Sequence, residues 1–492
     1  MRYPGFLFLL IMPCLGFNAA AQAPVRNLTL EEAIEIAKSQ SPDALNAKQT
    51  FKSSYWDWRS YKASNLPALG LTATAPSFNQ SIISQSVNGV QSYAAYQVIS
   101  ANANLGLTQK IGLTGGTISL NSNLSGVHNA NSPNQLPYVS VPINVQLNQP
   151  LFTYNQFKWD RKIMPLKYIQ AKRKYIEDIE QVAITASNYF FSLLQAQVEK
   201  KIAVINLSNY DTLYRIAKGR YQLGKIAENE LLTLELSYLK AQAAVENADL
   251  DLDNAQFRFK SYLRLQDSSR VLLLPPGNIA FFKIDPAKAI DLARSNSSNS
   301  LDFKKRLLDA ASAVNYAKLN GRFDANLSAV VGLTQQGSTI RDAYTNPSDQ
   351  RQFTLGVSIP IVDWGVAHGK IKMAQSQEDI VKNSVEQDAI DFERNVYLKV
   401  VQFNMQQNQL KIAAKSDTVA KKSYEVTKGR YLIGKINDIT NLNLSQIDQD
   451  NAEKNYYYAL QTFWTNYYEI RKLTHYDFRK NVALQFDMQI MK

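Results

Sequence analysis

Few side chains in this sequence have the type and spacing that enzyme chemistry requires. The three histidines, His128, His368 and His475, lie far apart in the chain, so a metal site built on histidine is not expected. The single cysteine is Cys14, and there is no nucleophile elbow, H-E-x-x-H motif, phosphate-binding loop or dinucleotide-binding glycine pattern. The sequence therefore predicts a protein that is not an enzyme and that uses neither a metal nor a cofactor.

The most specific motif occurs twice. Residues 218–226 read K-G-R-Y-Q-L-G-K-I and residues 428–436 read K-G-R-Y-L-I-G-K-I, so seven of nine positions match at an offset of 210. Gly224 and Gly434 can adopt the left-handed conformation that ends a helix, and an acid follows each motif, where the dipole of a second helix favours it. Each motif is predicted to form the turn of a helical hairpin.

Both copies of this motif also keep arginine, tyrosine and lysine, although a turn needs only the glycine. Two explanations are open: the residues are a remnant of duplication, or the turn binds a partner protein. The second hypothesis assigns partner docking to Arg220, Tyr221, Gly224, Lys225, Arg430, Tyr431, Gly434 and Lys435.

These turns belong to two tandem copies of one unit, each with a helix, a β segment, a long helix and a returning helix. The predicted boundaries are a first repeat over 22–271 (β segment 67–152, long helix 156–219, return helix 229–266), a linker over 272–285, a second repeat over 286–475 (β segment 324–362, long helix 366–429, return helix 437–474) and a tail over 476–492. The opening helices are expected over Leu28–Asn65, broken near Pro42, and over Pro286–Gly321. The first copy carries about 46 extra residues before Pro150, which form either a long loop or additional strands.

The long helices carry the spacing of a coiled coil. Nine apolar residues from Leu231 to Phe259 follow each other at steps of three and four, which predicts a supercoiled seam that holds the architecture. The β segments alternate apolar and polar residues, as in either an ordinary soluble sheet or a membrane wall. No run of about 18 apolar residues follows the N-terminal segment, so a membrane crossing would require a β-barrel.

The N-terminal residues indicate the compartment. A basic residue, an apolar run and Ala19-Ala20-Ala21 form a secretory signal peptide over 1–21, and lipidation of Cys14 is the rival interpretation. The net charge of +12 raises nucleic acid as a partner. Secretion argues against a nucleic-acid partner. The basic residues are also spread among 42 acidic ones, which indicates that most of them lie on solvated helix faces.

Together, the duplication, the order of elements, the R-Y-x-x-G turns and the Q-P-L-F and I-P-I-V strand ends resemble the outer membrane efflux protein family, the TolC-like outer membrane factors. The resemblance implies a mainly α fold with a membrane β-barrel portion, in which each chain of a homotrimer gives strands to one shared barrel and its helices form a periplasmic tunnel. The family gives four strands per chain and twelve in all, and this chain is expected to give four or more. It implies an export duct in the outer membrane of a Gram-negative bacterium, surrounded by outer-membrane lipid. Its tips would meet a periplasmic adaptor (membrane fusion) protein that links them to an inner-membrane transporter, in tripartite efflux or type I secretion.

Two further expectations follow from the resemblance. The family's periplasmic constriction carries acids six and nine residues after the second tip glycine, where this sequence has Thr440 and Asn443; the nearest acid is Asp438, and the first copy keeps Glu230. Aromatic residues at the strand-to-helix junctions form either a membrane-interface belt or a packed junction, and they are Phe152, Tyr154, Phe157, Trp159 and Trp364. The alternative to the channel is a soluble periplasmic coiled-coil scaffold or adaptor with a small non-membrane β domain.

Overall fold

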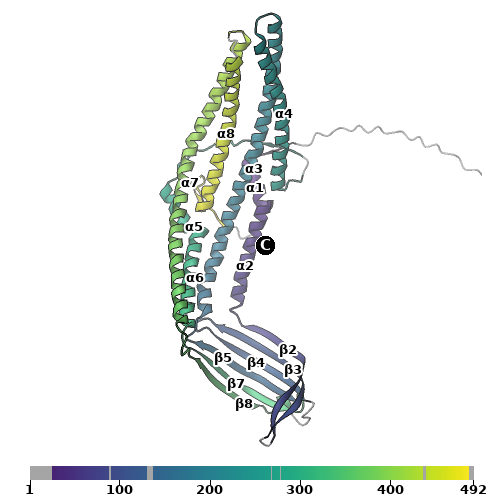
Figure 1. Cartoon of the computed structure of the whole chain (residues 1–492), viewed down its shortest axis with the longest axis vertical. Helices are drawn as coiled ribbons and strands as arrows, with labels where there is room; N and C mark the ends of the chain where they lie inside the picture. Colours follow the sequence, from purple (N-terminus) through teal and green to yellow (C-terminus); the bar gives the residue numbers. More distant parts are fainter. Residues whose placement is uncertain are drawn as a thin grey trace, which may run out of the picture. The chain divides into compact units, whose positions relative to one another are not determined.

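The computed structural model describes residues 25–87, 90–129, 137–266, 269–277, 279–435 and 439–486. The predicted signal peptide, Cys14 and Asp438 lie outside the described residues. Within them the chain is mainly helical and carries one six-stranded sheet (Figure 1). No described helix is both long enough and apolar enough to cross a membrane.

The described chain divides into two compact units, and the boundaries between them fall within helices and loops. One unit comprises the described parts of 1–42, 182–281 and 406–465, and the other comprises those of 43–181, 282–405 and 466–492. The first contains the hairpin turns and the second contains the sheet, so the two regions are treated separately below.

Each repeat opens with a pair of helices. They are α1 (Leu30–Gln40) and α2 (Pro42–Ala63) in the first repeat, and α5 (Pro286–Asn296) and α6 (Ser298–Asn320) in the second. The break at Ser41 is the one expected from Pro42. The break at Ser297 is not expected from the sequence, because no proline follows it. Both serines are buried, and each donates its backbone N–H to the alanine four residues earlier, so the duplication preserves the break.

The long hairpins have equal dimensions in the two repeats. Helices α3 (Gln156–Gln222) and α7 (Val366–Leu432) have 67 residues each, and helices α4 (Glu228–Leu263) and α8 (Ile439–Thr474) have 36 each. All nine residues of the apolar seam in α4 are buried or half-buried, and Leu234, Ala241 and Phe259 are fully buried. The 3,4 spacing therefore correctly identified the packed face of α4.

The sheet is antiparallel throughout and has the order β2-β3-β4-β5-β7-β8. Its strands are β2 (Ala68–Val87), β3 (Val90–Ile111), β4 (Gly116–Asn129), β5 (Tyr138–Leu151), β7 (Asp324–Gly337) and β8 (Ser348–Ser358), and the 3₁₀ helix η1 (Asp342–Tyr344) precedes β8. The first repeat thus contributes four strands and the second two. The extra residues before Pro150 form strands and not a long loop, and the chain carries six strands where the family resemblance implied four.

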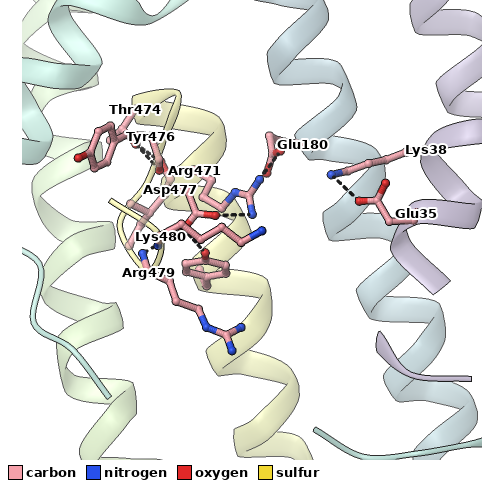
Figure 2. A network of polar contacts seen from close by, with 11 residues as sticks. Glu35, Lys38, Glu180, Arg471, Thr474, Tyr476, Asp477, Arg479 and Lys480 are labelled. Atoms are coloured by element: carbon pink, nitrogen blue, oxygen red, sulfur yellow. Dashed lines mark hydrogen bonds and ion pairs between the residues drawn. The ribbon is translucent and has the colours of Figure 1, made fainter. Parts of the chain in front are cut away.

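Short strands tie down the ends of the repeats. Strand β1 (Val25–Leu28) pairs in parallel with β6 (Arg270–Leu273), so the first two residues of the predicted linker lie in a strand. Near the C-terminus β9 (Tyr476–Asp477) pairs with β10 (Val482–Ala483). Figure 2 shows how this hairpin is held: Arg471 of α8 lies between Glu180 of α3, at 2.9 Å, and Asp477, at 3.3 Å.

Asp477 is the centre of that anchor. It also accepts the Tyr467 hydroxyl at 2.5 Å and the backbone N–H groups of Arg479 and Lys480, each at 3.0 Å. Burial alone would raise the pKa of Asp477, but the hydrogen bonds from Tyr467 and Lys480 and the charge of Arg471 outweigh it, so its pKa lies below the ordinary value. The carboxylate is therefore ionised in the folded chain at neutral pH.

Candidate functional site

The two hairpin tips share one backbone geometry. Gly224 and Gly434 have φ of +65° and +72°, which confirms the left-handed conformation expected at a C′ position. In the first tip the N–H of Gly224 donates to Tyr221 O at 2.9 Å and that of Lys225 donates to Arg220 O at 2.8 Å. The second tip repeats both bonds at 3.1 and 3.0 Å. This pair of bonds is the Schellman motif, which satisfies carbonyls that a helix end leaves free.

The side chains of the two tips do not share one environment. Tyr431 is 1% exposed, whereas Tyr221 at the same position of the first tip is 41% exposed. The Arg220 guanidinium reaches across to the second hairpin and donates to Leu432 O at 2.9 Å and to Tyr431 O at 3.4 Å. It also lies 5.5 Å from the centre of the Tyr431 ring. A cation at the C-terminal end of α7 is favoured by the helix dipole as well.

A hydrophobic cluster supports this contact. Tyr431 packs with Leu213, Leu234, Tyr424 and Leu442, which are all buried. Burial raises the pKa of Tyr431, the nearby Arg220 opposes this, and Glu230 raises it further, so the phenol stays neutral. Of the predicted docking residues, Arg220 and Tyr431 therefore hold the two hairpins together.

The exposed part of the tips includes residues that the motif did not single out. Tyr221, Lys225, Arg430 and Lys435 are exposed, as predicted docking residues must be. Two large apolar side chains, Leu223 at 75% exposure and Ile433 at 67%, occupy equivalent positions of the two tips. The variable pair inside R-Y-x-x-G could have revealed them, because both tips place an apolar residue directly before the second glycine.

The predicted constriction residues lie close to this cluster. Asn443 is half-buried and accepts the Tyr210 hydroxyl at 3.2 Å, so its amide is engaged within the chain. Thr440 is exposed. Glu230 is half-buried, and its Oε2 is a buried atom without a hydrogen-bond partner in the described part of the chain.

A ladder of polar contacts between α3 and α8 continues from this point. Asp450 accepts Asn206 Nδ2 at 2.6 Å and Gln446 Nε2 at 3.1 Å, and Gln446 also donates to Asn206 Oδ1 at 2.8 Å. Burial raises the pKa of Asp450, and these two amides oppose the shift without cancelling it. Helices α3 and α8 are thus joined near the tips by tyrosine and amide side chains and by the carboxyl group of Asp450.

The predicted interface aromatics divide into two kinds. Tyr154 shares a hydrogen bond of 2.6 Å with Ser312, Trp159 donates to Asn315 at 3.3 Å, and the ring of Phe152 lies 5.0 Å from that of Phe323. These three contact α6 or the residues after it, as a packed junction would require. Trp364, in contrast, has a φ of +53° and is 94% exposed.

Comparison with known proteins adds to this geometry. The pattern of the outer membrane efflux protein family matches residues 92–263 and 309–474. No curated protein sequence matches the chain. Among solved structures, the Campylobacter jejuni CmeC outer membrane channel is similar at 15% identity with a TM-score of 0.64, covering 94% of this chain and 87% of that one. The outer-membrane channel OprN has 15% identity and a TM-score of 0.65, with coverage of 90% and 89%.

The Vibrio cholerae outer membrane protein VceC is also similar, at 11% identity and a TM-score of 0.63, covering 93% of this chain and 97% of that one. These identities establish a fold that the chain shares with outer-membrane channel proteins. The family pattern, in contrast, extends over both repeats and over more than half of the sequence. The chain therefore belongs to the outer membrane efflux protein family and is an efflux channel protein of the outer membrane.

Proposed function

We propose that this chain is the passive outer-membrane duct of a tripartite efflux or type I secretion system, docked through its hairpin tips to a periplasmic adaptor and an inner-membrane transporter. Channels of this family generally form trimers and work in tripartite systems. The observation that carries the proposal is the pair of tips with one backbone geometry and an exposed set of apolar and basic side chains. A soluble periplasmic scaffold, the alternative, does not agree with membership of an outer-membrane channel family.

The sheet supports the assembly of three copies. Its edge strands β2 and β8 run in opposite directions, because the sheet has six strands and each runs antiparallel to its neighbours. Strand β8 of one copy can therefore pair antiparallel with β2 of the next, and three copies can close one cylinder without a free edge, as lipid requires. That wall would contain eighteen strands where the family resemblance implied twelve.

Mass measurement of the full chain in a mild detergent tests the assembly. A stable species of three chains is expected. A monodisperse monomer that keeps its β-sheet signal would contradict it.

The tips support docking to an adaptor. Leu223 and Ile433 together expose apolar side chains beside the bases Lys225 and Arg430, a combination that fits an amphipathic partner surface with acidic residues. Replacing Leu223 and Ile433 with Asp should abolish capture of the native adaptor from membranes, because it puts acids into an apolar contact. Leu250→Asp, at an exposed leucine of α4 away from the tips, is the control for an added charge. Equal capture by the double variant and the control would show that the tips do not dock the adaptor.

A further inference from the structure

The positive charge of this chain is concentrated where the helices meet the sheet. Five segments flank the ends of the strands: residues 55–67, 108–117, 152–163, 316–324 and 358–372. They hold ten bases and four acids, so their net charge of +6 is half of the chain's +12. We call the ten bases the junction collar, and they are Arg59, Lys62, Lys110, Lys158, Arg161, Lys162, Lys318, Arg322, Lys370 and Lys372.

None of the ten collar bases forms an ion pair with an acid of the described chain. Three of the four nearby acids are occupied otherwise. Asp57 pairs with Lys167 at 2.9 Å, Asp160 accepts Gln156 Nε2 at 2.6 Å, and Asp363 accepts backbone N–H groups at the start of α7. Nine of the ten bases are exposed, and Lys110 is half-buried.

Ion pairing returns farther along the same helices. Lys174 pairs with Asp178 on α3 at 2.8 Å, and Arg306 of α6 pairs with Asp388 of α7 at 2.7 Å. On α7, Lys382 pairs with Glu378 at 3.3 Å. Bases beyond the collar are therefore only partly paired, since Lys415 and Lys422 of α7 have no ion pair in the described chain either, whereas within the collar all ten bases lack one.

Aromatic rings lie among the collar bases. The ammonium of Lys62 lies 5.9 Å from the centre of the Trp58 ring, and that of Lys162 lies 5.1 Å from the Trp159 ring. Trp56 is 62% exposed. On the sheet side of the collar, the first strand residues are apolar and exposed, with Leu69 at 68% and Leu71 at 69%. Exposed apolar strand residues, aromatic rings and unpaired bases thus adjoin one another in this part of the chain.

We propose that the junction collar binds the phosphate groups of anionic phospholipids at the membrane surface. This rests on the outer-membrane placement of the channel. Exposed apolar side chains suit hydrocarbon, aromatic rings suit the interface, and long basic side chains can extend their charged ends to phosphates. A base close to an anionic membrane surface gains attraction that a solvated one lacks, and the absence of internal acid partners leaves the collar bases available for it.

Lipid retention by the full chain tests this proposal. The protein is purified in a mild detergent, equilibrated with equal amounts of phosphatidylglycerol and phosphatidylcholine, and its retained lipid is measured by mass spectrometry. The test variant replaces five exposed collar bases with Gln: Arg59, Lys62, Lys158, Arg161 and Lys162. The control replaces the same number of each type elsewhere on exposed helix faces: Arg215, Arg258, Lys240, Lys415 and Lys422.

The parent should retain more phosphatidylglycerol than phosphatidylcholine. In the collar variant the ratio of the two retained lipids should fall about fivefold for each base removed. The control should keep it, and a variant that exchanges Lys for Arg and Arg for Lys at the five positions should also keep it. The same sample gives the mass of the assembly, so loss of the trimer is distinguished from loss of lipid binding.

Several results would overturn the proposal. One is a parent without a phosphatidylglycerol preference, and another is an equal loss in the collar variant and the control. A collar variant with unchanged lipid retention but altered ion preference in planar bilayers would place the bases in the pore. Unchanged lipid retention with lost binding to isolated peptidoglycan would assign them to the cell wall.

Discussion

Replacing Arg220 with Ala should loosen the second hairpin tip, although Arg220 belongs to the first. Its guanidinium donates to Leu432 O and Tyr431 O at the end of α7 and lies over the Tyr431 ring. A hydrogen bond to a charged group contributes about 1.5–3 kcal/mol, and a cation at a helix C-terminus about 0.3–1 kcal/mol. Because Arg220 is half-buried and these terms overlap, we expect a loss of about 2 kcal/mol.

Hydrogen exchange measures this loss where it occurs. The amides of Gly434 and Lys435 are protected by bonds to Tyr431 O and Arg430 O, and a loss of 2 kcal/mol should speed their exchange roughly 30-fold. Arg430→Ala is the matched control, because Arg430 occupies the same position of the other tip and is exposed. Arg220→Lys should fall between parent and Ala, because one ammonium cannot form the guanidinium's fork. Equal exchange in the two Ala variants would refute the asymmetry of the tips.

Three other predictions follow from the same geometry. Replacing Gly224 and Gly434 with Val should strain each left-handed position by about 1–2 kcal/mol and abolish export while the protein still reaches the outer membrane; unchanged export would show that the tips are spacers only. Placing Asp at both Thr440 and Asn443 should open the pore or make it cation-selective, since a trimer gains six charges at a narrow aperture, and unchanged planar-bilayer conductance would exclude them from the constriction. Asp477→Asn should lower the free energy of unfolding in urea by about 2–3 kcal/mol at pH 7. Because the pKa of Asp477 is depressed in the folded chain, its contribution to the free energy of unfolding is fully present above the unfolded pKa of about 3.9 and is lost as pH falls through the folded pKa. If the variant stays less stable than the parent by the same amount below that folded pKa, this cause is refuted.

Features that depend on local sequence could be predicted. A glycine that follows a helical pattern and precedes an acid indicates a C′ turn without any knowledge of the rest of the fold, and both tips have it. The seam of α4 was equally legible, because a stepwise 3,4 pattern defines one face of a helix whatever packs against it. The Pro42 break belongs to the same class, since proline disfavours helix at the residue before it.

Features that depend on which segments meet in space could not be predicted. The strand alternation before Pro150 was visible, but alternation alone does not decide between strands and a loop, and the pairing of β5 with β7 joins segments that are far apart in sequence. The break at Ser297 was missed because no proline marks it, although the Ser and Asn residues over 296–300 favour a helix cap. The Arg-Tyr pair has the same sequence in both tips, so the sequence does not indicate that Arg220, and not Arg430, contacts the other hairpin.

The difference between the two tips concerns the roles that duplicated residues take. Both tips keep the backbone turn, yet one copy of the tyrosine is buried as a packing residue and the other remains exposed. A shared motif therefore does not mean a shared role: Arg220 and Tyr431 join the hairpins, whereas Tyr221, Leu223, Arg430 and Ile433 remain exposed. In an assembly of three chains the six tips would alternate between two surfaces. An adaptor that contacts them would then meet two kinds of site, and the two hairpins should tolerate the same substitution to different degrees.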